Sequence, residues 1–222
     1  MLEGTRCNTI EGADLIGSDQ AQGVNLLMEH LRSLGHERIG HVTGAGGSAD
    51  IRRRAYSDFM ESAGLEPLVN GSTNPTNEEG GYLGTVELLR EHPGLTAVFT
   101  ANDTMALGAR AALRETGYEV PGDVSLIGFD NSQLARSRFL DLTTVDNHAF
   151  DVGVACAEAL LRRIADPGAS PGHVTIPTSL VIRTSSAAPR TRRAGEPNRG
   201  HTGPWSNDRR GSRDRNGDRG CS

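Results

Sequence analysis

The stretch AVFTANDTMALGARAALRETGYEVPGDVSLIGFDN, from Ala97 to Asn131, decides the fold class. It begins with a short aliphatic run, continues with a segment of helical period that stops at Gly117, and closes with a second aliphatic run up to Phe129. A strand, a helix and a strand in this order predict a βαβ unit with two parallel strands. The nearly continuous apolar run before Phe129 is typical of a strand covered on both faces of its sheet.

The same alternation extends in both directions from this unit. Short aliphatic runs predict strands, and apolar residues recurring every three to four positions predict helices between them. Asp19 is placed to cap the first of these helices, and Gly35 to end it. The pattern predicts an α/β fold with parallel sheets and helices on both faces. The expected strands are 13–17, 38–43, 68–70, 96–100, 123–129, 142–145 and 173–184, and the expected helices are 20–34, 49–63, 78–90, 103–116 and 149–165.

Charge is distributed unevenly along the 222 residues. Residues 187–222 contain nine of the 23 basic residues but only four of the 28 acidic ones, so the rest of the chain is acidic. An acidic body gives no electrostatic footprint for nucleic acid. The segment 187–222 is rich in Arg and Gly and has one large apolar residue, Trp205, so we expect it to be disordered. An inert tail and a nucleic-acid contact both stay open, and the nearly alternating charge from Asp208 to Arg219 favours the inert tail.

Several classes of protein are disfavoured by what the sequence does not contain. It has no Lys, which the phosphate loop of nucleotide hydrolases, pyridoxal enzymes and Ser-x-x-Lys enzymes all need. Its three Cys residues, Cys7, Cys156 and Cys221, are far apart, which indicates a reduced, cytosolic chain. We also expect no membrane span, no secretion signal, no metal site and no cofactor, because no segment has the required apolar length or ligand spacing.

The candidate binding residues follow the predicted strands. In open parallel sheets, ligands bind at the carboxyl ends of the strands. Asn102 and Asp103 follow strand 96–100, Asp130 follows strand 123–129, and Arg52 lies on the helix that follows strand 38–43 and its glycine-rich loop. Asn, Asp and Arg together supply donors and acceptors that suit the hydroxyls of a sugar or polyol.

Each candidate also has a purely structural interpretation. Asn102 or Asp103 can cap the following helix, whereas no helix is predicted directly after Asp130. Arg52 can belong to an exposed helix face, and the loop 44–48 reads more simply as a turn than as an anion cradle. Two carboxylates past adjacent strands also allow acid–base chemistry on a glycoside, but neither has a recognisable activating neighbour.

Four stretches of this sequence resemble the effector-binding core of the LacI/GalR (lactose-repressor) family. They are EHLRSLGHERIGHVTG, the Ala97–Asn131 stretch, LTTVDNHAFDVG and LVIRTS, and the resemblance covers about residues 13–186. It implies a periplasmic-binding-protein-like fold of two lobes, joined by a three-stranded hinge, with the effector bound between them. It also implies a homodimer whose N-terminal helix-turn-helix domain reads operator DNA.

The resemblance carries over to individual positions. Asn102 in TANDTMALG and Asp130 in IGFDN fall where the family contacts effector hydroxyls, and Arg52 in IRRRAYSDF falls on a third contact. Thr76 stands near a position where many members have an aromatic residue that stacks on the ligand. Asp19 matches an acidic residue at the start of a helix, where we expect capping rather than contact.

The resemblance also implies a division into lobes. Residues 1–35 and 142–168 are expected to form a partial N-terminal lobe, and residues 36–141 and 169–186 a complete C-terminal, effector-binding lobe. The helix-turn-helix and the first strands of the N-terminal lobe have no counterpart here, so we expect a truncated protein that does not bind operator DNA by itself.

The sequence therefore predicts a cytoplasmic, non-enzymatic core of a LacI-type regulator that binds a sugar-like effector and dimerises. The first alternative is an extracytoplasmic sugar-binding protein of a transporter. The second is an enzyme acting on a glycoside or nucleotide.

Overall fold

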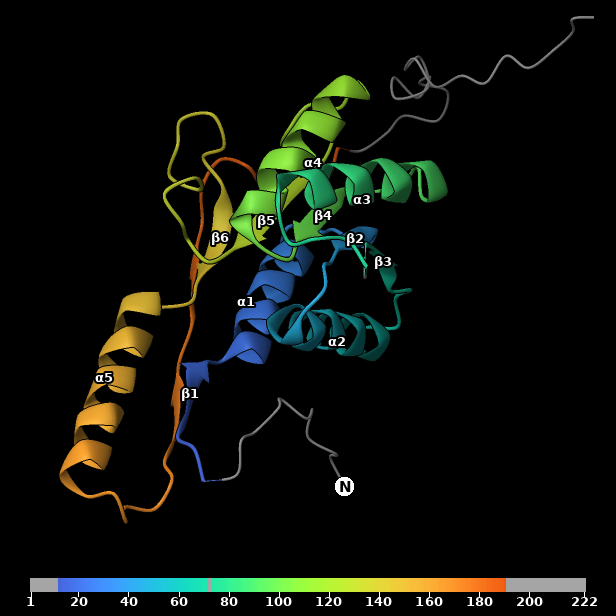
Figure 1. Ribbon diagram of the computed structural model, residues 1–222. Coiled ribbons are helices and arrows are strands. Elements are labelled where there is room, and N and C mark those ends of the chain that lie inside the picture. Colours follow the sequence, from blue (N-terminus) through green and yellow to red (C-terminus); the bar gives the residue numbers. More distant parts are fainter. Residues whose placement is uncertain (1–11, 72, 191–222) are drawn as a thin grey trace, which may run out of the picture.

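The computed structural model describes residues 12–71 and 73–190. Figure 1 shows an α/β structure with a large unit, built on a six-stranded sheet, and a small unit, built on a two-stranded sheet. In chain order the elements are β1 Leu15–Ser18, α1 Gln20–Ser33, β2 Ile39–Val42, α2 Gly47–Ser62, β3 Leu68–Asn70, α3 Glu78–Glu91, β4 Ala97–Thr100, α4 Asp103–Glu115, β5 Ser125–Phe129, β6 Thr143–Asp146, α5 Ala149–Ala165, β7 His173–Ile176 and β8 Ser179–Val181.

The large unit contains strands in the order β3-β2-β4-β5-β6-β8. The first five strands run parallel, and β8 pairs with β6 in the antiparallel direction. Helices α1 and α2 cover one face of this sheet, and α3 and α4 cover the other (Figure 1). The predicted parallel sheet with helices on both faces is confirmed.

Strand β4 shows how the two faces of the large sheet are filled. All of its residues are buried. Phe99 packs into the core under α1 and α2, whereas the adjacent Val98 packs into the core under α3 and α4. Because successive side chains of a strand point to opposite faces, a sheet covered on both sides needs apolar residues at every position. The continuous apolar runs of the sequence therefore mark central strands.

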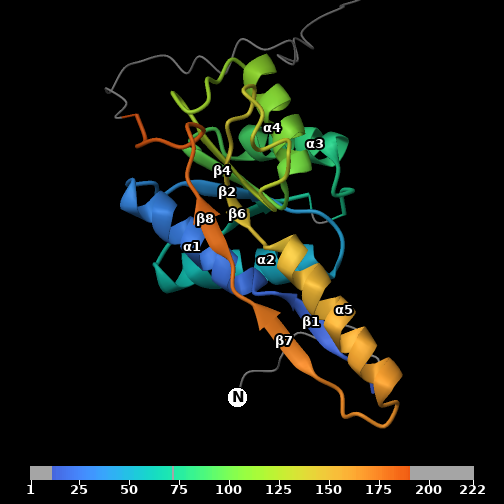
Figure 2. The same ribbon diagram turned by 90° about the vertical axis from the view of Figure 1, so that its left-hand side faces the viewer.

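The small unit consists of the parallel pair β1–β7 with α5 alongside it. Figure 2 shows this unit projecting away from the large sheet. Asp14 connects its parts: the carboxylate accepts hydrogen bonds from Arg162 at 2.8 Å, from Arg163 at 3.0 Å and from the backbone N–H of Gly172 at 2.6 Å. No residue of α5 is buried. Polar contacts at Asp14, rather than an apolar core, are thus the specific link between α5 and the strands.

The chain passes between the two units three times. The crossings are at Asp19 between β1 and α1, at 147–148 between β6 and α5, and at 177–178 between β7 and β8. The three crossings together form the hinge between the two units.

The division between the units differs from the sequence-based expectation. Residues 1–35 and 142–168 were expected in one lobe, but α1 and β6 belong to the large unit. The apolar stripe of α1 decides this, because Leu27 lies in the same core as Phe129 of β5 and Val145 of β6. The segment 173–184 was expected to be one extended stretch of the 169–186 part, but it divides into β7, which pairs with β1, and β8, which pairs with β6.

Smaller differences concern single segments. Helix α2 begins at Gly47, two residues before the expected start, which shortens the glycine-rich loop. Residues 187–190 were expected to be disordered, but Ala187 donates its N–H to Ser125 at 3.0 Å and Arg190 pairs with Asp123 at 3.1 Å. The rest of the expected tail, 191–222, lies outside the described residues, as do Cys7 and Cys221. Within the described ranges, no helix is long and apolar enough to cross a membrane.

Candidate ligand-binding site

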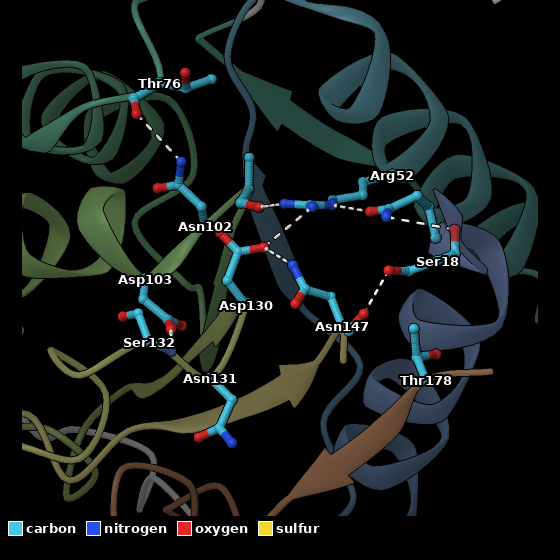
Figure 3. Close-up of polar contacts among 12 residues, drawn as sticks. Ser18, Arg52, Thr76, Asn102, Asp103, Asp130, Asn131, Ser132, Asn147 and Thr178 are labelled. Carbon is cyan, nitrogen blue, oxygen red and sulfur yellow. Dashed lines mark hydrogen bonds and ion pairs between the residues drawn. The ribbon is translucent and has the colours of Figure 1, made fainter. Parts of the chain in front are cut away.

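The candidate residues gather at the carboxyl edge of the large sheet (Figure 3). Asn102 follows β4, Asp130 follows β5, and Arg52 lies in the second turn of α2, which follows β2. Since β2, β4 and β5 are neighbouring parallel strands, their carboxyl ends meet at one edge. The topology therefore brings three separate parts of the sequence to the same place.

Arg52 is fixed in one orientation by its surroundings. Only 8% of its side chain is exposed. Its Nε donates to Gln20 Oε1 at 2.7 Å, its Nη1 donates to the carbonyl of Ala101, and its Nη2 donates to Asp130 Oδ1 at 3.3 Å. The guanidinium also lies over the Phe129 ring, with Cζ 3.8 Å from the ring centroid. Nη1 and Nη2 each carry a second N–H, so Arg52 retains donor capacity beyond these bonds.

Asp130 is the more accessible partner of this ion pair, with 35% of its side chain exposed. Its Oδ1 accepts from Arg52 and, at 3.0 Å, from Asn147 Nδ2, and among the described residues no hydrogen bond uses Oδ2. Burial raises the pKa of Asp130, while Arg52 and Asn147 lower it. The backbone φ of 109° is unfavourable for a residue with a side chain, at a cost of roughly 1–3 kcal/mol. Such strain is concentrated at functional sites.

Asn102 has a structural role that its position at the sheet edge does not reveal. Its Oδ1 accepts from the N–H of Met105 at 2.8 Å, which makes it the N-cap of α4, and its Nδ2 donates to the carbonyl of Thr76 at 3.2 Å. Within the described chain, the side-chain hydrogen bonds of Asn102 go to these two residues and not to the ion pair. Asn102 is nevertheless next to it, because the carbonyl of the preceding Ala101 holds Arg52.

Asp103 lies behind the site rather than in it. Its carboxylate accepts from the N–H of Ser132 at 2.7 Å and from the hydroxyl of Thr144 at 2.7 Å, and the residue is only 1% exposed. Burial raises the pKa of Asp103 to about 6, against the effect of these hydrogen bonds. Asp103 therefore ties α4 to β6 and to the loop that carries Asp130.

The site has the chemistry of a polar binding surface. The exposed oxygen of Asp130 is an acceptor, and the remaining N–H groups of Arg52 are donors next to it. The face of Phe129 is covered by the guanidinium, so this ring is not free to stack on a ligand there. Among the described residues, no group of three or more His, Cys, Asp or Glu side chains could hold a metal ion.

Comparisons with known proteins agree on one family. A profile described as a periplasmic binding protein-like domain matches residues 28–186. A LacI-family transcriptional regulatory protein from Corynebacterium glutamicum has a solved structure that matches with a TM-score of 0.72 and 38% identity, over 79% of this chain and 69% of that one. The chain belongs to the LacI family. Its periplasmic-binding-protein-like fold matches the cores of LacI-family structures.

Two further relatives extend the comparison. The transcriptional repressor PurR of Mannheimia succiniciproducens is 35% identical, over 78% of this chain and 52% of its own length. A LacI family regulator from Enterococcus faecium, solved with bound ribose, matches with a TM-score of 0.72 and 27% identity, over 82% of this chain and 68% of that one. The present chain spans about half the length of the curated relatives it matches.

Two residues of this LacI-family site were not predicted from the sequence. Asn147 donates to Asp130, and Gln20 accepts from Arg52. Asn147 comes directly after β6, so the rule that found Asn102 after β4 could also have found it. Gln20 begins α1 and carries no such signal, because only the folded structure brings α1 beside α2.

Proposed function

We propose that this chain is the effector-binding and dimerisation core of a LacI-type transcriptional regulator, and that its effector is a neutral sugar or polyol. One observation carries the proposal: in a LacI-family chain, a buried Arg52 holds a partly exposed Asp130 at the carboxyl edge of the sheet. A hydroxyl group donates and accepts at once, so it fits an acceptor oxygen placed beside guanidinium N–H groups. The ribose bound to the Enterococcus faecium relative is a ligand of this chemistry.

The proposed regulation depends on an equilibrium between two arrangements of the large and small units. A ligand that contacts both units changes the balance between two arrangements of them only through its different affinity for each. In a homodimer, this balance sets the relative position of the two copies. We expect operator DNA to be bound only by a longer chain that carries a helix-turn-helix, and we place the protein in the cytoplasm with the family's regulators.

An enzymatic function is a weaker candidate. A glycosidase needs two carboxyl groups that face the scissile bond. Asp130 is bound to Arg52, and Asp103 is only 1% exposed, with both oxygens bonded to Ser132 and Thr144. We therefore propose that the chain is not an enzyme. The transporter alternative lacks a specific supporting observation, since the matched relatives with a stated role are transcriptional regulators.

Thermal melts with added sugars test the binding proposal. Ribose and cellobiose are the first two of a panel of neutral mono- and disaccharides. A bound sugar at 100 times its Kd stabilises the native state by about 2.7 kcal/mol, which raises the melting temperature by several degrees.

Two variants locate the binding to the ion pair. Asp130→Asn removes the charged acceptor, and we expect it to weaken sugar binding at least tenfold. Arg53→Ala is the matched control, because Arg53 is the next residue of α2 and its ion pair is with Asp50 on the surface. A panel in which no sugar changes the melting temperature of the unmodified chain, or a sugar whose effect survives Asp130→Asn, would contradict the proposal.

A further inference from the structure

The three crossings of the hinge are bonded to one another. The N–H of Asp19, in the first crossing, donates to the carbonyl of Ile176 at 2.8 Å, and Thr178 Oγ1, in the third crossing, donates to the carbonyl of Asp19 at 3.2 Å. The hydroxyl of Ser18 donates to the backbone carbonyl of Asn147 in the second crossing. His148 Nε2 lies 3.1 Å from Oγ of Ser179, the first residue of β8, which connects the second crossing to the residue directly after the third. The hinge is therefore a bonded unit rather than three independent linkers.

The ion pair of the ligand site is bonded to the hinge at Asn147 and to Gln20, the residue that follows the first crossing. Arg52 donates to Gln20, the first residue of α1 after the first crossing, at 2.7 Å. Asp130 accepts from Asn147 in the second crossing at 3.0 Å. Figure 3 shows this continuous path from Arg52 through Asp130 and Asn147 to Ser18. Asp130, one of the two groups that would contact a ligand, thus also bonds the second crossing to the large unit.

The bond between Asn147 and Asp130 is the weakest point on this path. Oδ1 of Asp130 already accepts two hydrogen bonds, one from Arg52 and one from Asn147. A carboxylate oxygen has two lone-pair sites, so a donor that engages Oδ1, rather than the free Oδ2, has to replace one of them. Arg52 is buried and is held by Gln20, Ala101 and the Phe129 ring as well, so it cannot easily move away.

Within the described residues, the side chain of Asn147 makes no second hydrogen bond that would keep it in place. Its Oδ1 is buried without a hydrogen-bond partner among the described residues. The bond to Asp130 is therefore the only side-chain hydrogen bond that holds the amide within the described residues. In this position the buried Oδ1 lacks a donor there, which costs free energy. A movement that breaks the bond to Asp130 also gives that acceptor the chance to find a donor.

We propose that Asn147 is a positioning residue that couples the state of Asp130 to the angle between the large and small units. A ligand hydroxyl that takes the place of Asn147 at Asp130 removes this bond between the second crossing and the large unit, and leaves the crossing with the bond from the His148 N–H to Asp146 at 2.9 Å and with the bond to Ser18. The link to a ligand rests on the proposed function. The mechanical link between Asp130 and the hinge is independent of the proposed function, so it can be tested without a ligand.

The test measures the distance distribution between the two units by double electron–electron resonance on the full chain. The native Cys156 is exposed on α5 and takes one spin label. Glu87→Cys on the exposed face of α3 takes the second, and Cys7→Ser and Cys221→Ser remove the other thiols. The doubly labelled chain without further changes is the reference.

We expect Asn147→Ala to broaden or shift the distance distribution relative to the reference, and Asp130→Ala to produce the same change. The double variant should change it no further than either single variant, because the bond between Asp130 and Asn147 is the bond to the hinge that both changes remove. The exchange Asp130→Asn with Asn147→Asp restores a donor–acceptor pair across the same gap and should return the distribution toward the reference. Arg53→Ala, on the neighbouring position of α2, should leave the distribution unchanged.

The opposite results overturn the coupling. It is wrong if Asp130→Ala leaves the distribution at the reference, if the two single changes add, or if all variants and the reference are equally broad. Circular dichroism and melting of each variant identify one that does not fold, in which case Asn147→Ser replaces Asn147→Ala. Sugar melts are separate from this test: absence of any sugar effect contradicts the proposed function, while the response of the hinge to Asp130→Ala still decides the mechanical link.

Discussion

The large and small units are built from the same kinds of elements but differ in how those elements are buried. In the large unit, Tyr56, Phe99 and Phe129 are completely buried between helices and sheet. In the small unit, α5 has no buried residue, and its apolar side chains are exposed: Phe150 by 82%, Leu160 by 61%, Leu161 by 65% and Ile164 by 67%. The helices of the large unit bury their apolar stripes against the six-stranded sheet, whereas α5 has only the pair β1–β7 beside it.

Helices α4 and α5 show which features of a helix its hydrophobic periodicity can predict. Helices α4 and α5 both have an apolar stripe, and the stripe of α4 is buried from Met105 to Leu113. The sequence predicted both helices equally well, and α5 runs over 149–165 as predicted. The period of a helix identifies its apolar face, but the partner of that face depends on the sheet beside it.

The largest expected effect compares one phenylalanine from each unit. Phe99→Ala removes a buried ring that stacks on His41 at 4.3 Å between centroids, and should lower the free energy of unfolding by about 3–5 kcal/mol. Phe150→Ala removes a ring that is 82% exposed and should change it by less than about 0.5 kcal/mol. Urea denaturation followed by circular dichroism measures both. Equal losses in the two variants would show that the small unit is packed as firmly as the large one.

The pKa values of two aspartates, Asp103 and Asp14, are shifted in opposite directions. Burial raises the pKa of Asp103 in the large unit to about 6, above its usual value of 3.8, so the folded state holds this proton more tightly than the unfolded chain. The contribution of Asp103 to the free energy of unfolding is therefore greatest below pH 4 and falls by about 3 kcal/mol as the pH rises past 6. The difference between the unmodified chain and Asp103→Asn should follow this fall in urea titrations from pH 4 to pH 7.

Asp14 in the small unit supplies the control of opposite sign. The hydrogen bonds from Arg163 and Gly172, with the charge of both arginines, lower the pKa of Asp14 below its usual value. Its stabilising contribution is present above pH 4 and is lost as the pH falls below that. A difference between the unmodified chain and Asp103→Asn that stays constant across pH 4–7 would contradict the burial of a charged carboxylate behind the site.

The smallest expected effect concerns the exposed face of α5. Leu161→Arg places a charge where the side chain is 65% exposed, so the free energy of unfolding should stay within about 0.5 kcal/mol. Contiguous exposed apolar residues promote association, so the same change should reduce concentration-dependent self-association in sedimentation velocity runs. Leu88→Arg is the matched change at a completely buried position of α3 and should prevent folding. A large loss of stability in Leu161→Arg would mean that this face is covered in solution.

Much of the large unit could be predicted from the sequence, because its signals are local. Buried strands are continuous apolar runs, and Asp19 caps α1 by accepting from Gln22 at 2.8 Å, as predicted. The division between units could not be predicted in the same way. It depends on whether Leu27 and Val145 share a core and on which strand β7 finds as a partner, and both are contacts between residues distant in the chain.

The candidate site shows the same limit. Arg52, Asn102 and Asp130 could be named because strand ends meet at one edge of a parallel sheet and because the family resemblance marks these positions. Their partners could not all be named, since the bonds of Arg52 to Gln20 and of Asp130 to Asn147 join residues 32 and 17 positions apart. That Arg52 and Asp130 contact an effector stays a prediction.

The most direct test of the central claim is the side-chain NMR signal of Arg52 during a sugar titration. Its Nε–H donates to Gln20 at 2.7 Å in a buried position, which slows exchange with water, and the signal is assigned by its loss in Arg52→Lys. If Arg52 and Asp130 bind the effector, a sugar that raises the melting temperature shifts this signal saturably, with the Kd that the melts give. A sugar that stabilises the protein and leaves the Arg52 signal unmoved would contradict the account.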